Sequence, residues 1–130
     1  MDLNKLSLIG NLTADPESKT FPNGDVVVRF SVATNRTWRD PNTDEQQKHV
    51  EYTAVAARGK LADIVQQYLH KGSRVYVEGR LKTRRWKDKD GNPKSKTELI
   101  VLRLIIFGGR QARPEDFNTR LDLENATKPV

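Results

Sequence analysis

The chain has 130 residues, no cysteine and a net charge of +6, from 23 lysine and arginine residues against 17 aspartate and glutamate residues. This length suits a single domain, the lack of cysteine excludes disulfides and thiolate zinc sites, and no stretch approaches the roughly 20 apolar residues of a membrane-spanning helix. The positive balance favours a polyanion such as DNA or RNA over a membrane surface, and the first five residues show no secretory signal, which indicates a cytoplasmic protein.

Alternating apolar residues predict three strands in the first half of the chain. They cover residues 3–10, 25–34 and 50–57. The second is the clearest, because Val28, Phe30 and Val32 share one face. Residues 11–23 are rich in turn formers, and residues 36–49 are predicted to form a polar loop.

The second half begins with a different period. Residues 60–70 place apolar side chains at helical spacing, and Gly72 is suited to end that helix. A fourth strand then runs to Trp86, the Asp90-Gly91 step predicts a hairpin turn, and residues 96–107 form a last strand that is apolar on both faces, as in a covered or interface strand. Three strands, one helix and two strands is the order of the five-stranded oligonucleotide-binding (OB) barrel, so we expect an all-β OB-fold with one short helix.

The fourth strand predicts a binding surface. Extended geometry places four side chains on one face, namely Arg80, Lys82, Arg84 and Trp86. The opposite face is apolar and is expected to join the core through Val75, Val77, Gly79 and Leu81. Cations suit a phosphate chain and an indole ring suits an unpaired base, which is typical of a platform for single-stranded nucleic acid. The alternative is an ordinary solvated strand face.

Two further aromatic residues are candidates for base contact. Trp38 lies between Arg36 and Arg39 in the predicted loop, where it is expected to be exposed; the alternative is that it folds back onto the barrel. Tyr52 shares a strand face with Arg58, so a ring and a cation lie along one groove, unless Tyr52 packs at the edge of the core.

The remaining cations extend the predicted phosphate track. These additional phosphate contacts are Arg36, Arg39, Lys60, Lys71, Arg74 and Arg85, with solvated surface charge as the alternative for Lys60, Lys71 and Arg74. His49 and His70 are far apart in the sequence, and no nucleophile, metal or phosphate-loop motif is present. We therefore predict a non-enzymatic protein without metal or cofactor.

Short motifs in a fixed order run through residues 3–111. They are Asn4-Lys5, Leu8-Ile9-Gly10-Asn11-Leu12, Asp15-Pro16-Glu17, Ser31-Val32-Ala33-Thr34-Asn35, Trp38, Gly59-Lys60-Leu61-Ala62, Tyr68-Leu69, Lys71-Gly72-Ser73, Val75-Tyr76-Val77-Glu78-Gly79, Thr83-Arg84, Trp86 and Asp90-Gly91. In this order they resemble the bacterial single-stranded DNA-binding protein family. The resemblance implies an OB-fold barrel with a long β-hairpin arm and a homotetramer. It also implies action on single-stranded DNA at the nucleoid during replication, recombination and repair.

The resemblance also assigns residue roles. Trp38 and Trp86 fall on two stacking tryptophans of the family. Tyr52 stands at a stacking position where many members have Trp, and Arg58 at one where several have an aromatic ring. Residues 1–111 are thus expected to form the DNA-binding domain. Residues 112–130 are expected to form a flexible tail without the family's acidic tip, which leaves recruitment of replication and repair enzymes in doubt. Two alternatives are an assembly factor for replication restart and an RNA binder.

Overall fold

The computed structural model describes residues 1–108, and most of them lie in β-strands. The elements are β1 (Leu6–Leu12), β2 (Glu17–Thr20), β3 (Val26–Arg39), β4 (Gln46–Arg58), α1 (Gly59–Tyr68), β5 (Arg74–Lys87) and β6 (Pro93–Phe107). Within this part of the chain no helix has the length and apolar character needed to cross a membrane. The predicted boundary at residue 111 and the predicted tail lie outside the described residues.

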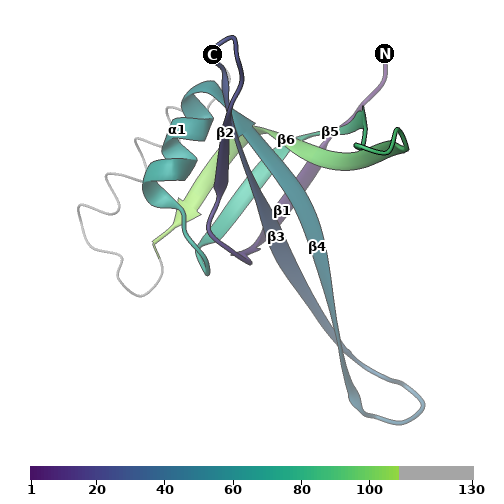
Figure 1. Cartoon of the computed structure of the whole chain (residues 1–130). Coiled ribbons are helices and arrows are strands. Elements are labelled where there is room, and N and C mark those ends of the chain that lie inside the picture. Colours follow the sequence, from purple (N-terminus) through teal and green to yellow (C-terminus); the bar gives the residue numbers. More distant parts are fainter. Residues whose placement is uncertain (109–130) are drawn as a thin grey trace.

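Five of the strands close into a barrel, as the sequence predicts (Figure 1). The strand order is β1-β5-β6-β4-β3, and pairing between β1 and β3 closes the ring, while β2 extends the sheet beyond β3. All pairs are antiparallel except β4 with β6, whose parallel register joins Val55 to Leu99. The OB-fold is thus confirmed, with one additional strand.

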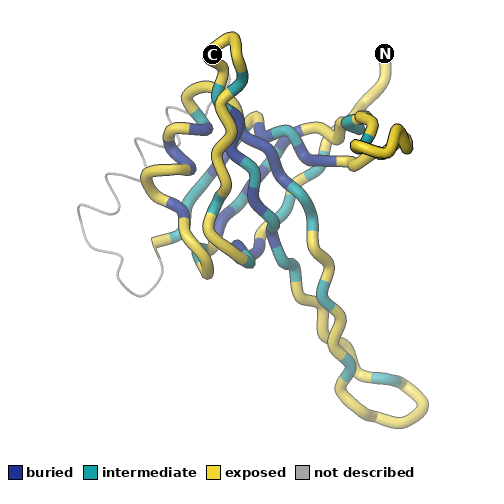
Figure 2. Tube along the Cα trace, in the orientation of Figure 1, coloured by how far each residue is buried: buried dark blue, intermediate teal, exposed yellow. Residues whose placement is uncertain are grey.

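The barrel interior is filled by alternate side chains of its strands, seen as dark blue stretches in Figure 2. Val28, Val32, Val55, Leu99 and Leu104 are completely buried. One face of α1 joins this core through Ala62, Ile64 and Val65, which explains the helical period of the sequence.

The short strand β2 lies in a segment that we predicted to consist of turns, so that prediction is wrong for residues 17–20. All four of its residues are exposed, and it pairs along one edge with residues 26–29 of β3. Its backbone hydrogen bonds form without any buried face, so no apolar alternation in the sequence could reveal it.

The predicted polar loop at residues 36–49 is also wrong for most of its length. β3 and β4 remain paired out to Arg39 and Gln46, and only the tip between them turns. The pair leaves the barrel as a long two-stranded arm, which is mostly exposed (Figures 1 and 2). Because both faces of this arm lie in solvent, its residues are polar although the backbone is regular. The sequence analysis expected a hairpin only at the Asp90-Gly91 step, so this arm was missed.

A second hairpin joins β5 to β6. Its turn is closed by the backbone amide of Asp88 donating to the carbonyl of Asn92, with Gly91 at φ +82°. The pairing is irregular between Glu78 and Gly79. Leu81 is 41% exposed, which corrects its predicted place in the core.

Candidate nucleic-acid interface

A groove crosses the barrel surface formed by β3, β4, β5 and β6. It consists of two adjoining pockets of about 510 and 250 Å³, which share Arg29, Arg84 and Glu98. Tyr52 lines the larger pocket and Arg58 lines the smaller one. The three shared residues therefore lie at the centre of the groove, between the ring and the cation predicted from the sequence.

Glu98 forms the centre of this cluster and is only 3% exposed. Its Oε2 accepts a hydrogen bond from Nε of Arg29 at 2.8 Å, and its Oε1 accepts one from Nε of Arg84 at 3.2 Å. Two guanidinium groups thus flank one buried carboxylate, which leaves a net positive charge at the groove centre. The sequence analysis missed both Glu98 and Arg29.

Trp86 extends this cluster toward the β5–β6 hairpin. The register places Lys82, Arg84 and Trp86 on one face of β5, as predicted. The guanidinium of Arg84 lies over the indole, 4.4 Å from the ring centroid, and Trp86 remains 40% exposed. A further pocket of about 420 Å³ on this hairpin is also lined by Trp86 and by Lys94. One face of the ring is thus held by a cation while part of its surface stays open to solvent.

Trp38 lies on the β3–β4 arm and not on a loop. It is 41% exposed, with the Arg36 guanidinium 5.2 Å from its ring centroid. The arm does not fold back onto the barrel, so the alternative of a buried Trp38 is excluded (Figure 1). Since Trp38 pairs with Gln47 whereas Ala33 pairs with Tyr52, the two rings occupy opposite faces of the pleated arm.

Tyr52 and Arg58 share one face of β4, as predicted from strand parity. Tyr52 is 66% exposed, which excludes the alternative in which it packs at the edge of the core. Arg58 precedes the first residue of α1 and makes no side-chain cap of that helix. Both side chains are therefore accessible along the groove.

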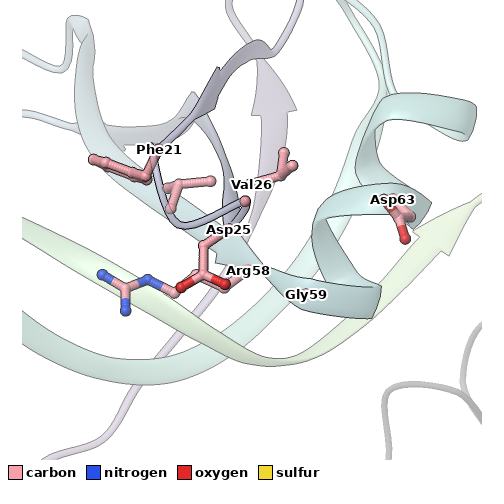
Figure 3. Close-up of a pocket in the computed structure, with 8 residues that line it drawn as sticks. Phe21, Asp25, Val26, Arg58, Gly59 and Asp63 are labelled. Atoms are coloured by element: carbon pink, nitrogen blue, oxygen red, sulfur yellow. The ribbon is translucent and has the colours of Figure 1, made fainter.

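Arg58 also lines a separate pocket of about 550 Å³ (Figure 3). This pocket lies between the β2–β3 turn and the start of α1, and Phe21, Asp25 and Asp63 also line it. Its lining holds one cation and two carboxylates. The larger groove pocket is also lined by carboxylates, because Asp15 and Glu17 lie there with Glu98 beside three cations. The smaller groove pocket, with five cations and one carboxylate, is therefore the most electropositive part of the groove.

The structure brings only some of the predicted cations together. Lys82, Arg84 and Arg85 line the smaller groove pocket with Arg58, and Lys96, which the sequence analysis missed, lines the larger one. Arg36 and Arg39 lie on the arm, where Nη1 of Arg39 is 3.7 Å from Asp44. The others lie outside both groove pockets: Lys60, Lys71, Arg74 and Arg80. Arg74 donates a hydrogen bond to Asn11 at 2.9 Å.

No three histidine, cysteine, aspartate or glutamate side chains gather to hold a metal ion anywhere in residues 1–108. Nε2 of His49 lies 2.6 Å from Glu51 on the exposed arm, and His70 contacts the carbonyl of Lys71. The two histidines therefore belong to different regions of the molecule.

Comparisons with known proteins agree with this geometry. The model of the single-strand binding protein family matches residues 3–107. A solved structure described as the Plasmodium falciparum SSB complex with ssDNA is 38% identical and has a TM-score of 0.74; the match covers 82% of this chain and 97% of that chain. A deletion mutant of the single-stranded DNA binding protein from Thermus aquaticus is 31% identical with a TM-score of 0.70, and the match covers 83% of this chain and 52% of that chain.

Proposed function

This chain belongs to the single-strand binding protein family, a non-enzymatic family that binds single-stranded DNA, and we propose that it holds DNA along the groove and the β3–β4 arm by base stacking and phosphate neutralisation. In this proposal bases stack on Trp38, Tyr52 and Trp86 and on the guanidinium of Arg58. Phosphates are neutralised by the cations predicted above, most directly by those that line the groove. Binding of this kind is largely independent of base sequence.

The observation that carries the proposal is the exposure of three aromatic rings, two of which lie beside guanidinium groups. Tyr52, Trp38 and Trp86 are 66%, 41% and 40% exposed, and the two indoles each lie close to a guanidinium. A protein gains nothing for folding by leaving large rings in water. Each ring is instead available to stack on a base, which contributes about 1–3 kcal/mol per base.

Titration of intrinsic tryptophan fluorescence with oligo(dT) tests this proposal. We expect oligo(dT) to quench the fluorescence of the wild type, and Trp38→Ala and Trp86→Ala each to weaken binding by about 1 kcal/mol or more. Thr37→Ala, an exposed neighbour of Trp38 on the same arm, is the matched control and should bind as the wild type does. The stacking proposal fails if both tryptophan variants retain full affinity. Competition with oligo(rU) at the same salt concentration distinguishes a preference for DNA from one for RNA.

In the same proposal the protein acts as a homotetramer. It coats DNA that is exposed during replication, recombination and repair, in the cytoplasm at the nucleoid. Membership of the family supports these assignments, and the excess of positive charge agrees with a polyanionic partner.

A further inference from the structure

We propose that Glu98 is a positioning residue for base stacking, which holds the Arg84 guanidinium so that Arg84 in turn fixes the ring of Trp86. This inference rests on the proposed function, because it concerns how one of the proposed stacking rings is oriented. Glu98 itself is buried and is not assigned a contact with DNA.

The first step is the isolation of Glu98 from solvent. It is the one polar or charged side chain that is fully buried in the described part of the chain, and both of its carboxylate oxygens accept hydrogen bonds from arginine. A buried carboxylate bonded on both sides has a fixed position, since any other rotamer would leave a buried charge unpaired. Glu98 is thus a rigid anchor beneath the groove.

The second step runs from the anchor to the ring. Arg84 is a long side chain with many rotamers, and its Nε atom is bonded to Glu98 while its guanidinium lies 4.4 Å from the centroid of Trp86. The carboxylate therefore restrains the cation, and the cation restrains one face of the indole. An indole restrained before DNA arrives loses less conformational entropy when a base stacks on it.

The third step concerns charge. A carboxylate at the groove centre opposes phosphate binding, so Glu98 lowers the electrostatic attraction of the groove while it improves the stacking surface. Replacing it with glutamine therefore has two opposite effects. Phosphate binding by the released arginines becomes stronger, and stacking on Trp86 becomes weaker.

The test measures oligo(dT) affinity for the wild type, Glu98→Gln, Trp86→Ala and the double variant, at about 0.1 and about 1 M salt. At high salt, where charge is screened, we expect Glu98→Gln to weaken binding about threefold or more, on the scale usual for members of one network. In the Trp86→Ala background the same change should cause no further loss. The slope of log affinity against log salt should also steepen, by about 0.7 for each arginine that gains a phosphate.

The outcomes separate this inference from the simpler roles of Glu98. If Glu98 has a purely structural role, Glu98→Gln should weaken binding at both salt concentrations, with and without Trp86. If its role is purely electrostatic, Glu98→Gln should bind at least as tightly as the wild type at both salt concentrations. Either result overturns the inference. If Trp86→Ala itself retains full affinity, the stacking proposal fails first.

Two further variants serve as controls. Asp63→Asn removes one negative charge from the exposed face of α1, outside the groove, and should leave the high-salt affinity unchanged. Thermal unfolding identifies a variant that does not fold. If Glu98→Gln does not fold, Arg84→Gln replaces it in the comparison with Trp86→Ala and the double variant. If Arg84→Gln then lowers the high-salt affinity equally with and without Trp86, the inference is overturned.

Discussion

Tyr52 and Arg58 define the two ends of the groove, and they offer DNA different kinds of contact. Tyr52 presents a ring and no charge in the larger pocket, whereas Arg58 presents a planar cation in the smaller one, and a guanidinium of this kind can both stack on a ring and attract an anion. The contact made by Arg58 is therefore expected to depend on salt, whereas the stacking contact made by Tyr52 is not expected to do so.

Arg58→Phe tests this difference. We expect the slope of log affinity against log salt to become shallower by about 0.7, because one phosphate contact is lost, while the affinity at high salt is retained by the new ring. Binding of oligo(dT) across a range of salt concentrations measures both quantities. Lys19→Gln, on the exposed strand β2, removes a cation outside the groove and should leave the slope unchanged. An unchanged slope for Arg58→Phe would contradict the assignment.

The rings could be identified from the sequence and the buried ion cluster could not. The rings give a local signal, because large aromatic residues close to cations are visible in short stretches of the sequence; they are Trp38, Tyr52 and Trp86. The Arg29 and Glu98 pair joins residues 69 positions apart, and nothing near either residue indicates the other. Only a weak signal for this cluster is present in the sequence. Glu98 is next to Leu99, which is buried, and a carboxylate that is buried with it requires a cationic partner.

Among the elements, the two hairpins show where sequence periodicity fails. A strand is visible in the sequence when one of its faces is buried, so the barrel portions of β3 and β4 were predicted. Their outer portions continue the same hydrogen-bonded register into solvent. Backbone pairing needs no alternation of apolar side chains, so these portions were not visible in the sequence. The same reason hid β2, whose four residues are all exposed.

The irregular pairing of β5 with β6 depends on Gly79. A side-chain methyl at this position would overlap the carbonyl oxygen of Ile100, and backbone cannot move aside as a flexible side chain can. We expect Gly79→Ala to destabilise the protein by about 1–3 kcal/mol through overpacking. Urea unfolding measured by circular dichroism gives this difference.

Gly91 provides the matched control in the same hairpin. It has φ +82° and open space around it, so Gly91→Asn places a residue that tolerates the left-handed region where nothing obstructs it. We expect a loss of less than about 1 kcal/mol. If Gly79→Ala is no more destabilising than Gly91→Asn, the close approach of β6 to Gly79 does not exclude a larger side chain there.

For the whole molecule, barrel closure required contacts that no local pattern encodes. The sequence predicted five strands and a helix in the correct order. The ring is completed by the parallel pair of β4 with β6 and by β1 with β3, between segments distant in the chain. The order of elements was therefore informative because it matched a known architecture.

One row of side chains on the outer face of β1, β5 and β6 is largely apolar, and the next row on that face, Ser7, Glu78 and Arg103, is polar. Ile9, Tyr76 and Ile105 lie in register across the three strands, and Ile9 is 48% exposed. Beside this row the Tyr76 hydroxyl donates a hydrogen bond to Glu78, which lowers the pKa of that carboxyl, and Lys5 acts in the same direction. Ile9 is thus a large apolar side chain left partly in water, and a second copy of the chain is one partner that could cover it.

Ile9→Glu tests whether a second copy of the chain covers this face. If the homotetramer forms here, the wild type should have four times the mass of the 14.8 kDa chain, and a carboxylate buried against an apolar partner should dissociate it. Native mass spectrometry measures the change. Ser18→Glu on β2 adds the same charge to an exposed strand and should leave the mass unaltered. A tetramer that persists in Ile9→Glu would place the subunit contact elsewhere, and a monomeric wild type would refute the proposed assembly while leaving the groove intact.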